Sequence, residues 1–164
     1  MIKKDVKQYF DLSGRTALIT GATRGIGFGL ASGLAHAGAK IILNGRNPDK
    51  LAEAADRLHL QDVSAQTLCF DVRDQQAVQK AVNNYESADG PIDILINNAG
   101  IQHRQSLENF STEKFQDVMN TNSTALFYLG QAVTRHMKQR RQGKIINIAS
   151  IMTKMARHHV GAYV

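Results

Sequence analysis

Five short apolar runs alternate with segments of helical spacing, and this alternation restricts the possible folds more than any other feature of the chain. The runs lie at residues 16–20, 41–43, 67–70, 92–96 and 145–148. Between them, apolar residues recur three or four positions apart, as they do on one face of a helix. Parallel strands need crossover connections, which are usually helices, so the order predicts βαβ units. The expected fold class is α/β, a doubly wound parallel sheet covered by helices on both faces.

Residues that favour helix ends support this assignment. Asn47 precedes Pro48, as at a helix start, and Gly38 stands where a helix C-cap is expected. Ser111 is the predicted N-cap of a single long helix that reaches to about residue 141. Another helix is predicted from Asp74 to about Ser87.

Composition places the chain among ordinary single domains. Its 164 residues are 43% hydrophobic and 21% charged, and no internal boundary is visible. Cys69 is the only cysteine, which argues against disulfides and a thiolate metal site, and we expect it to be buried on the third strand. No apolar run reaches membrane-spanning length, and the first residues lack a signal-peptide core. We therefore expect a cytoplasmic enzyme domain with no metal and no membrane partner.

The chain is basic, with a formal net charge of +6. The densest basic run, at residues 135–144, falls at the end of the predicted long helix. Cations there complement the helix dipole, so a solvated helix end is favoured over a nucleic-acid surface. No nucleic-acid partner is expected.

Three glycines, Gly21, Gly25 and Gly27, lie between the first predicted strand and the first predicted helix. Glycine at such a turn lets a pyrophosphate approach the backbone at the positive end of a helix. The spacing is G-x-x-x-G-x-G rather than the standard G-x-G-x-x-G. Ordinary turn chemistry is the alternative, but the position between strand and helix favours a dinucleotide site.

Several motifs, taken in order, resemble the short-chain dehydrogenase/reductase family. The turn at residues 20–27 resembles its cofactor turn, and residues 97–100 (Asn-Asn-Ala-Gly) resemble its second signature. Asn122, Ser150 and Tyr163 match its catalytic residues, with Tyr163 standing 13 positions after Ser150. The resemblance implies one Rossmann-like, dinucleotide-binding domain over residues 1–164, with its C-terminal strands beyond Val164. The fifth strand would then have an unpaired apolar edge.

The resemblance also implies a set of cofactor-binding residues. They are Gly21, Thr23, Arg24, Gly25, Ile26, Gly27, Arg46, Asp71, Val72, Asn98, Ala99, Gly100 and Tyr163. The second strand ends in Asn-Gly-Arg-Asn, without the carboxylate that favours NAD. Arg24 and Arg46 suit a 2′-phosphate, so NADP is expected rather than NAD, the alternative being two exposed loop arginines.

In the family, a tyrosine exchanges a proton with the substrate oxygen while the cofactor transfers hydride. By resemblance Tyr163 takes this role, Ser150 bonds the substrate oxygen, and Asn122 holds a water in the proton relay. The family also uses a lysine four residues after the tyrosine, a position that lies beyond Val164. A catalytically inactive, cofactor-binding fragment is therefore the second hypothesis.

Residues 98–104 and 133–137 resemble the family members that interconvert D-gluconate and 5-keto-D-gluconate. Arg104 could hold the carboxylate of such a sugar acid, or be a solvated loop residue. Ser150 and Tyr163 would complete the substrate site. A 3-oxoacyl thioester is the alternative substrate. The long helix resembles one through which family members associate, so a homo-oligomer, dimer or tetramer, is expected.

Overall fold

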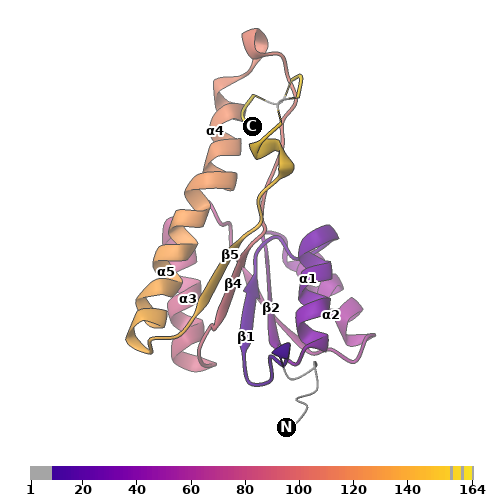
Figure 1. Cartoon of the computed structure of the whole chain (residues 1–164), viewed down its shortest axis with the longest axis vertical. Helices are drawn as coiled ribbons and strands as arrows, with labels where there is room; N and C mark the ends of the chain where they lie inside the picture. The colour runs from indigo at the N-terminus through magenta and orange to yellow at the C-terminus, as the bar shows by residue number, and fades with distance from the viewer. Residues whose placement is uncertain (1–8, 156, 160, 164) are drawn as a thin grey trace, which may run out of the picture.

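A computed structural model describes residues 9–155, 157–159 and 161–163. Five parallel strands form one sheet in the order β3-β2-β1-β4-β5, with helices on either side (Figure 1). The strands are β1 (Thr16–Ile19), β2 (Lys40–Gly45), β3 (Ala65–Cys69), β4 (Ile94–Asn97) and β5 (Lys144–Asn147). The α-helices are α1 (Gly25–His36), α2 (Pro48–His59), α3 (Gln75–Ala88), α4 (Thr112–Met119) and α5 (Ala125–Gln139). The predicted doubly wound α/β fold is confirmed.

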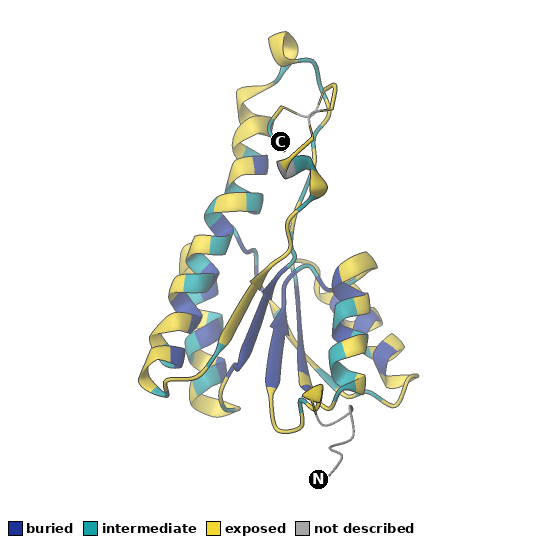
Figure 2. Cartoon of the chain, in the orientation of Figure 1, coloured by how far each residue is buried: buried dark blue, intermediate teal, exposed yellow. Residues whose placement is uncertain are grey.

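Strands β1, β2 and β4 are buried on both faces. Leu18 of β1 packs on the α3 and α5 side of the sheet, in one core cluster with Ile42 and Leu95. Its neighbour Ile19 packs in the opposite cluster, where α1 and α2 cover the sheet. Figure 2 shows these central strands as the buried centre of the molecule. Alternate side chains entering two apolar layers explain why the runs are continuously apolar.

The predicted helix ends are confirmed. Asn47 caps α2 by accepting from the Lys50 backbone N–H at 2.9 Å. Asp74 caps α3, and Ser111 caps α4 by accepting from Lys114 N–H at 3.4 Å. Gly38 follows α1 with φ +97°, the left-handed conformation that glycine adopts most easily.

The long helix predicted from Ser111 to about residue 141 is found as a continuous helical stretch from Thr112 to Gln139, but it is not α-helical throughout. A π-helical turn, Asn120–Thr124, separates α4 from α5. Its sequence, NTNST, is composed of residues that compete for backbone hydrogen bonds and favour helix ends. The π-helical turn places Asn122 where both polar atoms of its side chain bond the backbone of Ile101.

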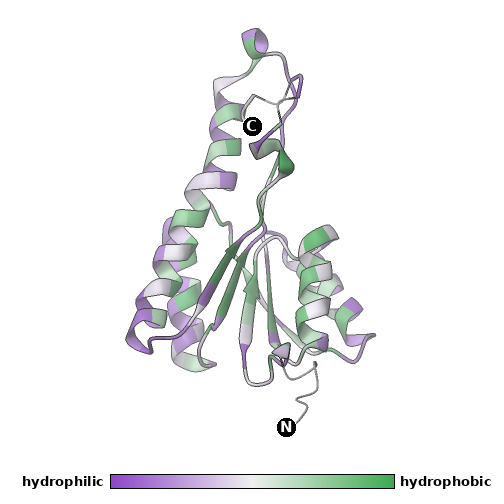
Figure 3. Cartoon of the chain, in the orientation of Figure 1, coloured by the Kyte–Doolittle hydropathy of each residue, from purple (hydrophilic) through white to green (hydrophobic). Residues whose placement is uncertain are grey.

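Burial on both faces does not extend to the edge strands. Ile145 and Ile146 of β5 are 41% and 47% exposed and belong to neither core cluster. Figure 3 shows this strand as an apolar ribbon, and Figure 2 shows it exposed. Within the described residues, β5 pairs only with β4. We attribute its exposure to this position at the edge of the sheet.

Cys69 is exposed, so the expectation of a buried cysteine is wrong. It ends β3, which is the other edge strand and pairs only with β2 in the described sheet. Its Sγ lies 3.6 Å from the Arg46 carbonyl oxygen. A position at the end of an edge strand leaves the side chain without a covering layer.

Beyond the carboxyl ends of the strands, α4 rises above the sheet beside the loop after β4 and the last described residues (Figure 1). A backbone bond from Gln105 N–H to the His159 oxygen, 2.9 Å long, joins these two segments. Among the described helices, none has both the length and the apolarity that a membrane span requires.

Candidate functional site

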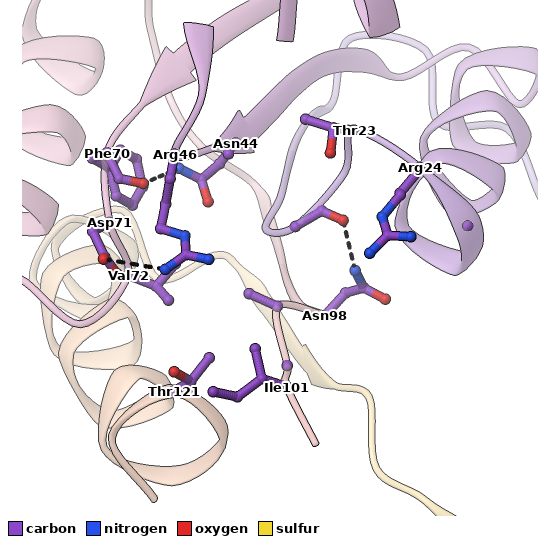
Figure 4. A pocket seen from close by; sticks show the side chains of 15 residues that line it. Thr23, Arg24, Asn44, Arg46, Phe70, Asp71, Val72, Asn98, Ile101 and Thr121 are labelled. Carbon is purple, nitrogen blue, oxygen red and sulfur yellow. Dashed lines mark hydrogen bonds and ion pairs between the residues drawn. The ribbon is translucent and has the colours of Figure 1, made fainter. Parts of the chain in front are cut away.

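A cleft of about 460 Å³ opens at the carboxyl ends of the central strands (Figure 4). It lies where β1 pairs with β2 on one side and β4 on the other, which is where the strand order reverses. Open α/β sheets bind ligands at such a switch point, because consecutive connections leave it toward opposite faces. The lining residues are Gly21, Thr23, Arg24, Gly25, Asn44, Gly45, Arg46, Phe70, Asp71, Val72, Asn98, Ala99, Gly100, Ile101 and Thr121.

The glycine turn forms one wall of the cleft. Gly21 and Gly25 have φ values of +61° and +59°, which side-chain-bearing residues rarely adopt. A Cβ on Gly21 would also stand 2.9 Å from the Ala99 Cα. Glycine is therefore required at this turn both by conformation and by close approach to the chain after β4.

Thr20 and Asn98 fix the turn to the end of β4. The Thr20 hydroxyl accepts from the backbone N–H groups of Asn98 and Ala99, each at 3.0 Å. The Asn98 side chain donates in return to the carbonyl oxygens of Thr20, at 2.9 Å, and Gly21, at 3.2 Å. These reciprocal bonds fix the two loops relative to each other.

The N-terminus of α1 opens at the same wall. Arg24 is its N-cap and provides no side-chain acceptor, and the first turn carries no acidic residue. The first N–H groups of a helix have no intrahelical partner and carry a partial positive charge. Together with the glycine backbone, this arrangement suits a phosphate group.

Two arginines flank the cleft. Arg24 projects from the α1 side, and Arg46 projects from the end of β2 toward Asp71 (Figure 4). Arg46 Nη1 lies 3.7 Å from Asp71 Oδ2, and the Arg46 side chain is 61% exposed. Hydrogen bonds from Arg73 are the main cause that lowers the pKa of Asp71, and the charges of Arg73 and Arg46 add to the effect. Asp71 is therefore an ionised carboxylate beside the cleft at neutral pH.

Most of the predicted cofactor residues line the cleft. They are Gly21, Thr23, Arg24, Gly25, Arg46, Asp71, Val72, Asn98, Ala99 and Gly100. Ile26 instead faces solvent on α1, 69% exposed. Gly27 is buried beneath the turn, with the Asn98 side chain and the Gly21 oxygen against it. Tyr163 does not line the cleft.

Five lining residues were not predicted: Asn44, Gly45, Phe70, Ile101 and Thr121. Asn44 had a usable signal, an amide within an otherwise apolar strand. It is buried and donates to the carbonyl oxygens of Leu68 and Phe70, at 3.0 and 3.1 Å. It thereby joins the ends of β2 and β3 at the cleft floor.

The predicted catalytic residues are not gathered at this cleft. Asn122 lies next to it, with its side chain bonded to Ile101 N–H at 2.9 Å and Ile101 O at 2.8 Å. Ser150 caps a short 3₁₀ turn after β5 by accepting from Met152 N–H at 3.2 Å. Tyr163 lies in a turn above the sheet, and Arg104 is exposed on the loop after β4. The described structure thus gathers most of the predicted cofactor residues at the cleft but does not bring Asn122, Ser150, Tyr163 or Arg104 into its lining.

Comparison with known proteins agrees with this geometry. A family model described as short chain dehydrogenase matches residues 15–164. The chain is 51% identical over 154 residues to gluconate 5-dehydrogenase of Gluconobacter oxydans, covering 94% of this chain and 60% of that protein. It is 42% identical to 5-keto-D-gluconate 5-reductase of Escherichia coli, covering 94% of this chain and 61% of that protein.

A solved structure of gluconate 5-dehydrogenase from Burkholderia cenocepacia, in complex with NADP and tartrate, superimposes with a TM-score of 0.92. It is 44% identical, and the match covers 97% of this chain and 62% of that chain. The chain therefore spans about 60% of the length of the curated relatives it matches.

Proposed function

The chain belongs to the short chain dehydrogenase family, and from this premise we propose an NADP-dependent oxidoreductase that interconverts D-gluconate and 5-keto-D-gluconate. The observation that carries the proposal is the glycine cradle flanked by Arg24 and Arg46, without a carboxylate at the end of β2. The similarity to gluconate 5-dehydrogenase and 5-keto-D-gluconate 5-reductase supports the choice of substrate.

The cleft fits a dinucleotide. Gly21 and Gly25 line the cleft without side chains, and the N-cap residue of α1 makes no side-chain hydrogen bond to the helix. We assign the pyrophosphate to this turn and the 2′-phosphate to the two arginines, because guanidinium groups bind phosphate through a planar fork of donors. Asp71 and Val72 would flank the adenine.

In this proposal the bound cofactor supplies or accepts the hydride at the substrate carbon. Tyr163 donates its hydroxyl proton to the carbonyl oxygen during reduction and takes it back during oxidation. Ser150 donates a hydrogen bond to the same oxygen and orients it. Asn122 contributes to the proton relay, and its bonds to Ile101 hold the π-helical turn in place.

Arg104 is the proposed partner of the substrate carboxylate. It is exposed on the loop that follows the Asn-Asn-Ala-Gly segment, so its guanidinium is accessible to an anion. Exposed aromatic side chains on α4 and α5, Phe115 at 44% and Phe127 at 64%, support the proposal of a homo-oligomer formed through these helices.

The test is a titration of the chain with NADPH and with NADH, followed by cofactor fluorescence, and then turnover with 5-keto-D-gluconate. We expect NADPH to bind more tightly, and Arg46→Met to weaken NADPH by about tenfold while leaving NADH nearly unchanged. Arg135→Met, on the exposed side of α5, removes the same charge away from the cleft and serves as the control.

Tyr163→Phe should bind NADPH normally and lose turnover. Equal or tighter binding of NADH would contradict the cofactor assignment. Binding of NADPH without turnover by the unaltered chain would favour the inactive cofactor-binding protein. Reduction of a 3-oxoacyl thioester in place of 5-keto-D-gluconate would overturn the substrate.

A further inference from the structure

Arg73 connects the cofactor cleft to α4 through two carboxylates. Its Nε lies 3.2 and 3.1 Å from the two Asp71 oxygens, and its Nη2 lies 2.7 Å from Asp71 Oδ2. Its backbone N–H also donates to Asp71 Oδ1 at 2.9 Å. At the other end, Arg73 Nη1 donates to Asp117 Oδ1 on α4 at 3.1 Å. Asp71 is thus held mainly by Arg73.

Arg46 is the weaker partner of the same carboxylate. Its 3.7 Å contact with Asp71 is longer than any of the Arg73 bonds, and its side chain is nearly twice as exposed, at 61% against 34%. Two-point arginine–carboxylate pairs are stronger and more specific than single long contacts between exposed groups. The charge of Asp71 is therefore compensated within its own loop, and Arg46 can turn to another anion at low cost.

We propose that Arg73 is a positioning residue that sets the preference for NADP: it compensates Asp71 so that Arg46 stays available to the 2′-phosphate. This inference rests on the proposed function, because it assumes that Arg46 meets that phosphate. Without Arg73, the Asp71 carboxylate would repel the phosphate and hold Arg46 as its nearest described cation. Both effects act against NADP and leave NAD, which lacks the 2′-phosphate, almost untouched.

Asp117 gives Arg73 its fixed position. Both guanidinium ends of Arg73 are engaged, one by each carboxylate, so the fork cannot rotate toward the cleft and bind the cofactor itself. Asp117 also lies 3.8 Å from Lys114 on the same helix, which keeps this end of the network close to neutral. Arg73 is therefore bound to two carboxylates of the protein, whereas Arg46 lines the cleft and can bind an anion there.

The experiment measures the dissociation constants of NADPH and NADH for the unaltered chain, Arg73→Met, and Arg73→Met combined with Asp71→Asn. The readout is the ratio of the NADH constant to the NADPH constant, because any general loss of the adenine contact cancels in it. We expect Arg73→Met to lower this ratio by about tenfold, as estimated for one unit of charge acting on a phosphate dianion at the surface. The double variant should restore the ratio to within about threefold.

Arg135→Met is again the matched control and should leave the ratio unchanged. An unchanged ratio in Arg73→Met would overturn the inference. A ratio that falls in Arg73→Met and is not restored by adding Asp71→Asn would also overturn the inference. Such a result would mean that the substitution disrupts the loop, and not that it leaves the charge of Asp71 uncompensated. If the unaltered chain binds NADPH no more tightly than NADH, the proposed cofactor fails first and the role of Arg73 falls with it.

Discussion

The close approach beneath the glycine turn gives a sharp prediction for Gly27→Ala. A Cβ at this position would stand 2.5 Å from Asn98 Nδ2 and 2.6 Å from the Gly21 carbonyl oxygen. The Gly21 oxygen belongs to backbone in a constrained turn, so it cannot move without moving the turn. Inserting one carbon into so tight a site typically costs about 1–3 kcal/mol. Alanine gains up to about 1 kcal/mol over glycine in a helix, which offsets only part of this cost.

We therefore expect Gly27→Ala to lower the free energy of unfolding by up to about 2 kcal/mol, the difference between these two effects. The same displacement would push the Asn98 amide away from the Gly21 and Thr20 oxygens, which it bonds at 3.2 and 2.9 Å. Because these bonds fix the wall of the cleft, NADPH affinity should fall together with stability.

Gly29→Ala is the matched control on the same helix. Nothing lies within 4 Å of a Cβ built there, so the substitution should stabilise the chain by about 0.5–1 kcal/mol. Urea unfolding followed by circular dichroism measures both variants. If Gly27→Ala proves as stable as Gly29→Ala, the argument from close approach is refuted.

Two further predictions concern ion pairs. Arg140→Met should lower the free energy of unfolding by about 2–3 kcal/mol, because it leaves the Glu86 carboxylate without its two-point partner. Urea unfolding should show that adding Glu86→Gln to this variant recovers part of the loss. The carboxylate is only 7% exposed and receives Arg140 bonds of 2.9 and 3.1 Å. For Asp71, Arg73 lowers the pKa below the ordinary 3.8, so its stabilisation is present above pH 3.8 and is lost as pH falls through the lowered pKa. The difference in unfolding free energy between the unaltered chain and Asp71→Asn should accordingly shrink between pH 5 and pH 2.5; a constant difference would contradict the assignment.

The doubly wound α/β fold was predictable because the central runs carry their own signal. Leu18 and Ile19 must be buried on opposite faces, and only a strand between two helical layers does this. The π-helical turn within the long helix was not predictable from periodicity, because the apolar spacing continues on both sides of Asn120–Thr124. Its cause is a contact distant in sequence, the Asn122 amide against Ile101. The exposure of Ile145 is likewise a property of the sheet edge, which the local sequence does not record.

For the site, the sequence located what depends on backbone conformation. Gly21 and Gly25 require left-handed φ values, and that requirement is visible as glycine at those positions. Side chains that reach the cleft from other elements were found less well. Thr121 lies on the π-helical turn beside Asn122, and Phe70 lies between β3 and Asp71, but the resemblance assigns a role to neither of them.

The backbone of the glycine turn and the side chains that flank it differ in how firmly the protein holds them. Thr20, Asn98 and the glycine turn are bonded to one another, so the protein itself holds the surface assigned to the pyrophosphate, a group that NAD and NADP share. In the proposed function, discrimination between NADP and NAD falls instead to Arg46, whose side chain is mostly exposed and only loosely paired. The sequence shows that Arg46 is present, but whether it is available depends on how firmly Arg73 holds Asp71. If Arg73 acts as proposed, cofactor preference is a property of competing ion pairs, and a change at Arg73, which does not line the cleft, should alter it as much as a change within the cleft itself.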